Sequence, residues 1–292
     1  IHYYYMSNDY KALRHSTKVD YRYFLDLLEY EIGHRKHGTV TSKVAKQVYE
    51  KWVEKGISYA NHAATCASRV FNYAIEMEQV TYNPFTNIKR KTVSQRKVVW
   101  KHSDVIKFLD VCFSQYDYRN MGMIVAMAYQ WCQRLGDMRN LTWDSIDFDQ
   151  QRLYLEQSKR RAEVFLPIDK SLFNMLKEQH VDFGFQPYVA PHPRPSGGKF
   201  HPYAMERLSK VGRKIMREAG ISNELRLMDL RRTGVTQMVE AGVPLPQVMA
   251  VTGHTHVASV KPYMKNTYTS ANNALTARTA HVKSNTVSNI GK

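Results

Sequence analysis

The chain is poor in cysteine, and its cysteines and histidines lack the spacing of a metal site. Only three cysteines occur in 292 residues, and none is part of a C-x-x-C pair, which argues against both a disulfide framework and structural zinc. The 12 histidines show no H-E-x-x-H or comparable ligand spacing. We therefore predict no metal site and a reducing compartment. The three cysteines are Cys66, Cys112 and Cys132.

Long apolar runs and targeting signals are also absent. The longest strongly apolar stretch, Gly122 to Tyr129, is much shorter than the roughly 20 residues that a membrane-spanning helix needs. We therefore predict no membrane span. The first residues show neither an initiator methionine nor a signal-peptide pattern, so we expect a trimmed chain or a natural fragment. Whether a further domain precedes Ile1 is left open.

Acidic residues are outnumbered throughout the chain. The sequence has 42 Lys and Arg against 26 Asp and Glu, a formal net charge of +16. Such an excess suits a polyanionic partner, whose condensed counterions are released on binding. Nucleic acid is the first candidate partner, and a merely basic soluble protein is the alternative.

One segment has no acidic residue at all. From Gln79 to Ser103 there is no Asp or Glu, while six basic residues follow the dipeptide Asn83-Pro84. They are Lys89, Arg90, Lys91, Arg96, Lys97 and Lys101. We predict a basic linker over residues 89–101 that is held against phosphates, and a solvated connector without a ligand is the alternative.

The apolar pattern predicts helices before this linker. Phe24, Leu27, Leu28 and Ile32 recur at helical spacing, and Ser16-Thr17 can cap that helix. A second helix carries the apolar residues Val44, Val48 and Trp52 and ends near Gly56, and a third opens at Ser58. Residues 1–88 are therefore predicted to form a small helical bundle.

After the linker, the period changes from helix to strand and back. A helical stripe that runs to Leu135 is followed by short β-like runs at 145–148, 152–155 and 163–168, which predict a three-stranded antiparallel meander. The segment 183–201 is rich in Pro and Gly and is expected to be a loop, after which helical spacing returns. The predicted fold is mainly α with a small antiparallel β-sheet, an α+β class, with a second domain over 102–270 and a tail over 271–292.

Four separated motifs carry the functional signal. They are Gln133-Arg134-Leu135-Gly136-Asp137, Ser158-Lys159-Arg160, Asp229-Leu230-Arg231-Arg232-Thr233, and Thr252-Gly253-His254 followed nine residues later by Tyr263. In this order and spacing they resemble the catalytic domain of the tyrosine recombinases of the phage integrase type. The resemblance covers about residues 100 to 270, and the N-terminal helices look like the core-binding domain of that family.

The resemblance implies a site-specific DNA recombinase that cuts and rejoins strands through a covalent 3′-phosphotyrosine. It implies double-stranded DNA attachment sites as substrates, a homotetramer on paired sites, DNA-bending accessory proteins in some systems, and no cofactor or metal. It also implies the cytoplasm of a bacterial host, at the nucleoid.

The chemistry explains why such a site needs two arginines and a tyrosine. Attack on a phosphodiester requires neutralisation of its non-bridging oxygens, and planar guanidinium groups do this with directed, charge-assisted hydrogen bonds. Arg134 and Arg231 are the candidates. A free phenol has a pKa near 10, so the candidate nucleophile Tyr263 must lose its proton during attack and gains from nearby positive charge. Tyr268 is the rival nucleophile.

The resemblance assigns three supporting roles. Lys159 matches the hairpin lysine that protonates the leaving 5′-oxygen, although the neighbouring Arg160 and Arg161 leave its register open. His254 would hydrogen-bond a non-bridging oxygen and take part in proton transfer, with His256 as a weaker alternative. Asp137 resembles the acidic residue that orients the site without reacting.

One position departs from the family pattern. The first residue of the H-x-x-R element is usually histidine, and here it is Met228, which can neither accept nor donate a proton. Three interpretations follow: the usual proton acceptor is dispensable here, another group replaces it, or the chain is catalytically impaired.

Two other functions remain as alternatives. The segment from Leu230 to Val251 could be the helix-turn-helix of a non-catalytic DNA-binding protein, which would leave Arg134, Lys159 and Tyr263 unexplained. A type IB topoisomerase would share the tyrosine, the arginines and the lysine but would relax supercoils as a monomer. The N-terminal helical bundle favours the recombinase.

Overall fold

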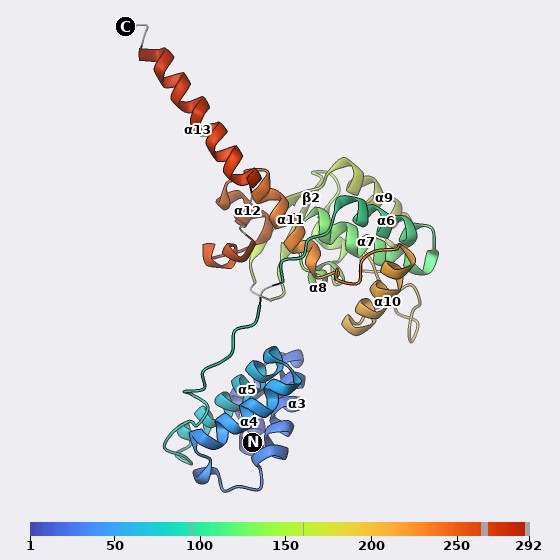
Figure 1. Cartoon of the computed structure of the whole chain (residues 1–292). Coiled ribbons are helices and arrows are strands. Elements are labelled where there is room, and N and C mark those ends of the chain that lie inside the picture. Colours follow the sequence, from blue (N-terminus) through green and yellow to red (C-terminus); the bar gives the residue numbers. More distant parts are fainter. Residues whose placement is uncertain (95, 160, 264–267, 290–292) are drawn as a thin grey trace. The chain divides into compact units, whose positions relative to one another are not determined.

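The computed structural model of the chain describes residues 1–94, 96–159, 161–263 and 268–289, except for the side chains of residues 262, 268–270 and 284–289. It contains two compact units, residues 1–95 and 96–292 (Figure 1). The predicted linker over 89–101 is divided between them. Among the described residues, no helix combines the length and the apolar character needed to cross a membrane.

The first unit is helical, as the spacing of apolar residues predicts. Its helices are α1 (His2–Met6), α2 (Asn8–Lys11), α3 (His15–Ile32), η1 (His37–Thr39), α4 (Ser42–Lys55) and α5 (Ile57–Glu76). The short helices α1 and α2 were not predicted. The predicted cap at Ser16-Thr17 is wrong because α3 begins one residue earlier, at His15.

Buried aromatic and aliphatic side chains hold α3, α4 and α5 together. Leu25, Tyr49 and Trp52 are at most 1% exposed, and Phe85, which follows α5, packs on the same core. The predicted Asn-Pro exit folds back on α5, because the Asn83 amide donates hydrogen bonds to the Ser68 carbonyl at 2.9 Å and to Asn72 at 2.6 Å. The exit from the bundle is therefore a fixed turn.

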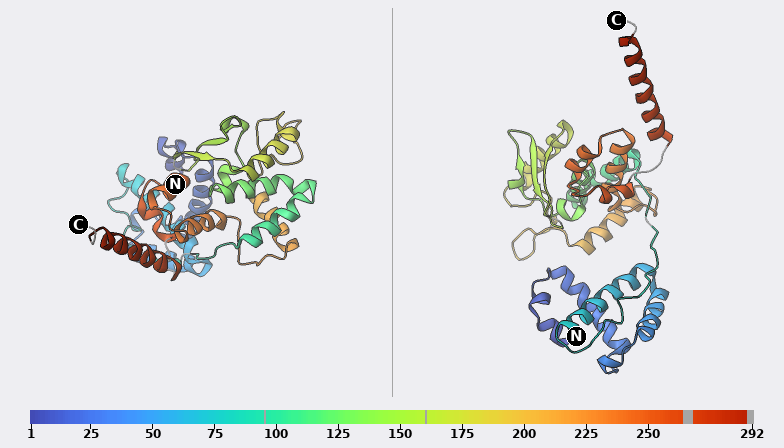
Figure 2. Two further views of the ribbon diagram at one scale, coloured as in Figure 1. Left: turned by 90° about the horizontal axis from the view of Figure 1, so that it is seen from above. Right: turned by 90° about the vertical axis from the view of Figure 1, so that its left-hand side faces the viewer.

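The second unit combines helices with one small sheet (Figure 2). Its elements are α6 (His102–Phe113), α7 (Tyr116–Gln130), α8 (Leu135–Met138), η2 (Trp143–Ser145), β1 (Ile146–Asp147), β2 (Arg152–Glu156), β3 (Glu163–Pro167), α9 (Lys170–Phe183), α10 (Met205–Glu218), α11 (Asp229–Glu240), α12 (Leu245–Thr252), η3 (Val257–Ser259), η4 (Lys261–Tyr263) and α13 (Tyr268–Asn289). The segment between α9 and α10 contains no helix, which agrees with the predicted loop.

The sheet is the predicted antiparallel meander, in the order β1-β2-β3. Alternate residues of β2 and β3 are buried, because successive side chains of a strand point to opposite faces. Leu153 and Leu166, which are paired across the strands, face the core. The mainly helical fold with a small antiparallel sheet is thus as predicted.

The start of the second unit is fastened to α11. The Trp100 backbone N–H donates to the Thr233 hydroxyl at 2.9 Å, and the Trp100 indole donates to the Arg226 carbonyl at 3.0 Å. On another side of α11, Gly234 lies so close to Cys132 that an added Cβ would fall 2.2 Å from the sulfur. These contacts hold the first turns of α11 between the end of α7 and the incoming chain.

The predicted tail over 271–292 is largely the helix α13, which begins at Tyr268, three residues before the predicted start of the tail. Its described side chains, residues 271–283, are all exposed, including the apolar Leu275 at 62% and Val282 at 49%.

Candidate active site

The first turn of α11 carries the buried arginine of the site. The Arg231 side chain donates from Nη2 to the Thr252 carbonyl at 2.6 Å and from Nη1 to Gln133 Oε1 at 3.3 Å. Its Nη2 also lies 3.4 Å from Nε2 of His254. With 7% of the residue exposed, this guanidinium is fixed on several sides.

No carboxylate of the described residues forms an ion pair with Arg231, so its hydrogen-bond partners are neutral groups. Burial is the largest cause that lowers the pKa of Arg231 to about 10, and the nearby positive charge of Arg134 acts in the same direction, while Tyr263 and the negative charge of Asp137 oppose the shift. The side chain remains a cation at neutral pH. A buried cation with neutral partners is well suited to accept an anion.

The second guanidinium lies next to the sheet. Arg134, which immediately precedes α8, donates from Nη1 to Gln157 Oε1 at 2.7 Å and lies 3.6 Å from Oδ2 of Asp137. Its side chain is 26% exposed, so part of the guanidinium is open to a ligand. Hydrogen bonds through Gln157 and Gln133 connect Arg134 to Arg231.

Asp137 links this arginine to the turn between β2 and β3. Its Oδ1 accepts hydrogen bonds from the Ser158 backbone N–H at 3.1 Å and from the Ser158 hydroxyl at 2.5 Å. A carboxylate that is 4% exposed and bonded to the turn can hold the turn in place. This arrangement is compatible with the orienting role expected of Asp137.

Lys159 occupies that turn, as predicted. The turn is closed by hydrogen bonds from Gln157 N–H to the Ala162 carbonyl at 2.8 Å and from Arg161 N–H to the Gln157 carbonyl at 2.9 Å. Lys159 is exposed and takes part in none of the ion pairs of the described residues. The turn that carries Lys159 is joined to Arg134 through Asp137 and Gln157. Arg160 lies outside the described residues.

The Gly-His pair sits at the end of α12. Gly253 ends the helix in the left-handed conformation with φ of 66°, and an added Cβ there would lie 2.7 Å from the Gln157 amide nitrogen. The His254 Nδ1 atom lies 2.7 Å from the Thr252 hydroxyl, which donates to the Val248 carbonyl at 2.7 Å. The hydroxyl proton is thus already used, and Nδ1 is the donor of the pair. His256 is exposed.

The candidate nucleophile lies against this histidine. Tyr263 ends η4, and the ring centroids of Tyr263 and His254 are 5.8 Å apart. The Arg232 guanidinium lies 5.1 Å from the Tyr263 ring centroid, so a positive charge faces this tyrosine. The Tyr263 ring packs on a small core that contains Val235, Val248 and Val260 and remains half-buried. The side chain of Tyr268 lies outside the described residues.

Met228 lies immediately before α11 and is 66% exposed. A side chain this exposed is not held by packing, so packing does not explain the methionine. The alternative helix-turn-helix is present as α11 and α12, but the same two helices carry Arg231 and His254. The geometry of α11 and α12 therefore does not distinguish the two functions.

Sequence reasoning missed several residues that hold the site together. Gln157 and Thr252 are fully buried at 0% exposure. Gln157 accepts a hydrogen bond from Arg134, and the Thr252 carbonyl accepts one from Arg231. Gln133 and Arg232 were noted only as parts of their motifs. A lone polar residue next to a turn gives no signal of its burial, so only the three-dimensional structure identifies Gln157.

The basic residues of the predicted linker fall into two groups. Lys89, Arg90, Lys97 and Lys101 are exposed and belong to no ion pair of the described residues, whereas Lys91 and Arg96 pair with carboxylates of the protein. Lys91 pairs with Glu50 at 2.6 Å, and its backbone N–H donates to the Tyr49 hydroxyl at 2.8 Å. Arg96 donates to both carboxylate oxygens of Asp229, at 3.0 and 2.7 Å. DNA contact by Lys89, Arg90, Lys91, Arg96 and Lys97 stays a prediction.

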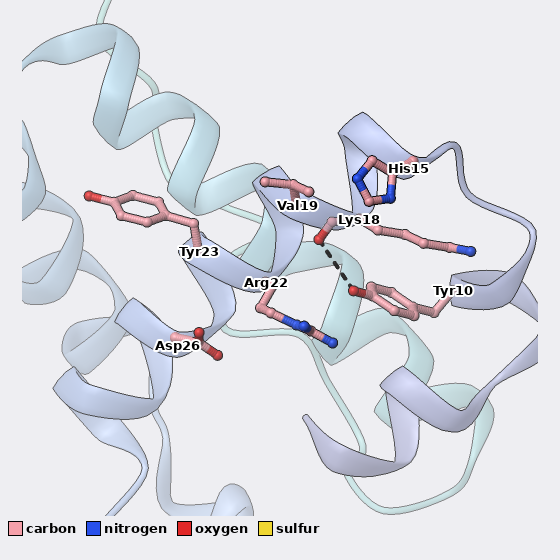
Figure 3. Close-up of a pocket in the computed structure, with 7 residues that line it drawn as sticks. All are labelled: Tyr10, His15, Lys18, Val19, Arg22, Tyr23 and Asp26. Carbon is pink, nitrogen blue, oxygen red and sulfur yellow. Dashed lines mark hydrogen bonds between the residues drawn. The ribbon is translucent and has the colours of Figure 1, made fainter. Parts of the chain in front are cut away.

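A separate hollow of about 530 Å³ lies in the first unit (Figure 3). It is lined by His15, Lys18, Val19, Arg22, Tyr23 and Asp26 of α3 and by Tyr10 of α2. The Tyr10 hydroxyl donates to the Lys18 carbonyl at 3.2 Å. Basic and aromatic groups dominate this surface, but none of the candidate catalytic residues contributes to it.

Within the described residues, no three His, Cys, Asp or Glu side chains are grouped so that they could hold a metal ion. The structure instead gathers Arg134, Arg231, His254 and Tyr263 from segments that are far apart in the sequence, with Lys159 on the adjoining turn. Two guanidinium groups, a histidine and a phenol are the kinds of group that can bind a phosphodiester and attack it.

Residues 99–270, more than half of the chain, match the model of the phage integrase family. The chain belongs to this family. The tyrosine recombinase of Thermosipho africanus (strain TCF52B) is 24% identical over 202 residues, which are 66% of this chain and 66% of the relative. This phage integrase family member therefore spans just under two thirds of that relative's length.

Solved structures of integrases share the fold of this family member. A lambda integrase dimer bound to a COC′ core site has a TM-score of 0.74 at 16% identity, with 88% of this chain and 91% of that chain covered. A Tn1549 transposon integrase in complex with transposon right end DNA has a TM-score of 0.68 at 18% identity, with 91% and 94% covered. A lambda integrase tetramer bound to a Holliday junction has a TM-score of 0.73 at 16% identity, with 87% and 73% covered.

Proposed function

We propose that this phage integrase family member is a site-specific DNA recombinase that acts through a covalent 3′-phosphotyrosine. The observation that carries the proposal is the convergence of Arg231, His254 and Tyr263, with centroids of the last two rings 5.8 Å apart and Arg231 Nη2 3.4 Å from the histidine. The partners are double-stranded attachment sites in the host cytoplasm, where a homotetramer forms on paired sites. Bending proteins assist where the sites require it.

The reaction conserves the energy of the phosphodiester. The Tyr263 oxygen forms a bond to the scissile phosphorus, and the bond from phosphorus to the 5′-oxygen breaks. Arg134 and Arg231 neutralise the non-bridging oxygens, and Lys159 gives the leaving 5′-oxygen its proton. The phenolic proton passes to His254 or to water, since Met228 cannot take it. A 5′-hydroxyl of another strand then reverses the reaction, and no ATP is consumed.

The proposal is tested by trapping the covalent adduct. Duplexes from the two ends of the genetic element that carries the gene are nicked close to the cleavage position, so that the short 5′-hydroxyl strand diffuses away and the reaction cannot reverse. We expect a complex that survives denaturation with detergent, with the DNA attached to the peptide that contains Tyr263. Failure of the wild-type protein to form an adduct on any of these duplexes would exclude the mechanism.

Topoisomerase activity is the second candidate, because the tyrosine, arginines and lysine are shared. It differs in outcome, since it would relax a supercoiled plasmid without paired sites. Exchange of strands between two duplexes, with little relaxation by single protomers, would favour recombination.

Loss of the Lys159 ammonium should slow cleavage by about 10²- to 10³-fold, because general acid catalysis of a departing oxygen is worth that much. Lys159→Ala should recover to within about tenfold of the wild type when sulfur replaces the leaving 5′-oxygen, since a thiolate departs without a proton. The measurement is the single-turnover cleavage rate on matched oxygen and sulfur duplexes.

Arg161→Ala is the matched control, because it removes a positive charge from the same turn at a side chain that is 77% exposed. It should leave both rates within about threefold. If Arg161→Ala and not Lys159→Ala showed the selective rescue by sulfur, the general acid would be misassigned.

Introducing the family's usual histidine should keep or increase cleavage. Met228→His alters a side chain that is 66% exposed, so the stability should change by less than about 0.5 kcal/mol. A proton acceptor three residues before Arg231 can then assist deprotonation of the phenol, with a gain of up to about tenfold. The single-turnover rate and the melting temperature check this. A folded variant that no longer cleaves would show that Met228 has a role of its own.

A further inference from the structure

Two fully buried glutamines lie between the two guanidinium groups of the site. Gln133, which directly precedes Arg134, is 1% exposed, and Gln157, which follows β2, is 0% exposed. Burying an amide costs free energy unless its polar atoms are hydrogen-bonded. The contacts of these two amides therefore show what they are arranged to hold.

The Gln157 amide contacts Arg134 on one side and the end of α12 on the other. Its Oε1 accepts from Arg134 Nη1 at 2.7 Å, and its Nε2 donates to the Thr252 carbonyl at 2.8 Å. The same Nε2 donates to Gln133 Oε1 at 2.7 Å. Since a guanidinium can only donate, the amide oxygen must face Arg134, and the orientation of the amide is fixed.

The Gln133 amide continues the connection to the second arginine. Its Oε1 accepts from Arg231 Nη1 at 3.3 Å as well as from Gln157, and its Nε2 donates to the carbonyls of Trp131 at 2.8 Å and Val251 at 2.7 Å. A continuous chain of hydrogen bonds thus runs from Arg134 through Gln157 and Gln133 to Arg231. The two amides also bond to the backbone, at the carbonyls of Trp131, Val251 and Thr252.

A neutral acceptor suits this position better than a carboxylate. Arg96 shows the alternative within the same unit, because Asp229 holds it with two charge-assisted bonds and neutralises it. At Arg134, which already has the Asp137 carboxylate at 3.6 Å, an amide orients the guanidinium without adding a second negative charge beside it. Two amides in series also fix the separation of the two cations.

We propose that Gln133 and Gln157 are positioning residues that set the spacing and orientation of Arg134 and Arg231 for the scissile phosphate. This inference rests on the function proposed above. Neither glutamine needs to touch DNA, and both act through the arginines that they hold. A guanidinium that is displaced by about 1 Å from its place can cost about 100-fold in rate.

The test compares Gln157→Met with Gln179→Met in the single-turnover cleavage of nicked duplexes from the ends of the element. Gln179 is the matched control because it is also 0% exposed and donates to Asn120 and to the Val189 carbonyl, away from the site. We expect Gln157→Met to lower the rate constant about 30-fold, within the range for a misplaced catalytic group, and Gln179→Met to leave it within about twofold. DNA affinity and the loss of melting temperature should be similar for the two variants.

The rate constant at saturating protein does not depend on the fraction of protein that is folded. A loss of folded protein lowers only the amplitude of the reaction.

A double-mutant cycle separates positioning from other effects. Added to Arg134→Lys, which lacks the planar fork, Gln157→Met should cost less than about threefold. Gln157→Glu provides a second variant of the same volume, and it should also be slow because its charge neutralises Arg134.

The outcomes separate this inference from the proposed function. If the wild type cleaves and both Gln157 variants cleave at its rate, or if the effects of Gln157→Met and Arg134→Lys multiply in full, the positioning role is wrong and the recombinase function stands. If the wild type forms no adduct on these duplexes, both are overturned.

Discussion

Replacing Tyr263 by phenylalanine is expected to abolish the covalent protein–DNA adduct while DNA binding stays within about twofold. The change removes one oxygen from a half-buried ring and retains the ring contacts to His254 and Arg232. Loss of a nucleophile lowers the rate by at least about 10⁴-fold, because no other group can form the covalent bond in its place. Denaturing electrophoresis measures the adduct, and a native gel-shift titration measures binding.

Two matched substitutions make this result specific. Tyr116→Phe alters a tyrosine of the same unit that is 67% exposed and should leave adduct formation unchanged. Tyr268→Phe tests the rival nucleophile and should also retain the adduct. The assignment is contradicted if Tyr263→Phe still forms the adduct, and Tyr268 becomes the nucleophile if only its variant loses it.

Other nucleophiles near Arg231 are poorly suited to the same attack. Burial raises the pKa of the Cys132 thiol to about 11, even though the positive charge of Arg231 acts in the opposite direction. The thiol is therefore protonated at neutral pH and cannot act as a thiolate.

Arg231→Met is expected to reduce cleavage by about 10³-fold without destabilising the protein. Removing a preorganised donor to a developing phosphate charge has a cost of this order. The folded-state pKa of Arg231 lies below its unfolded value, so the buried cation destabilises the folded state at neutral pH. This destabilisation is relieved only when the pH rises above about 10. When the guanidinium is removed, the two oxygens to which it donated, Gln133 Oε1 and the Thr252 carbonyl, still accept hydrogen bonds from Gln157 Nε2. We expect the free energy of unfolding to stay equal or to rise by about 1 kcal/mol.

Arg96→Met is the matched control for the stability measurement. It leaves Asp229, whose side chain is 3% exposed, without its partner and should cost about 2 kcal/mol, less than a fully buried pair because the Arg96 side chain is 32% exposed. Chemical denaturation and single-turnover cleavage measure the two effects. A strong loss of stability in Arg231→Met would show that the buried cation is structural.

The sequence predicted the parts of this protein that depend on local pattern. The apolar spacing of Val44, Val48 and Trp52 identified α4, and the alternation around Leu153 identified a strand of the meander. The motifs around Arg134 and His254 were recognisable because several chemically distinctive residues stand at fixed spacing. Their convergence on one site could be expected only from the resemblance to a family.

Other features depend on contacts between distant segments and had no local signal. Arg96 looks like one more basic residue in a positively charged segment, yet its partner Asp229 lies 133 positions later. Gln157 looks like a solvated residue beside a turn, because the groups that contact it come from the two residues before α8 and from the end of α12. Neither burial nor the choice between a phosphate and a carboxylate partner can be predicted from spacing alone.

The left-handed glycine at the end of α12 has a wider consequence. At Gly253 two demands coincide, since the backbone conformation disfavours any side chain and the space for a Cβ is already filled by the Gln157 amide. Even a residue that tolerated the conformation would push the hairpin and the histidine loop apart. The missing side chain at Gly253 thus lets the turn that carries Lys159 and the loop that carries His254 pack closely together, and any larger residue there would move these two side chains apart.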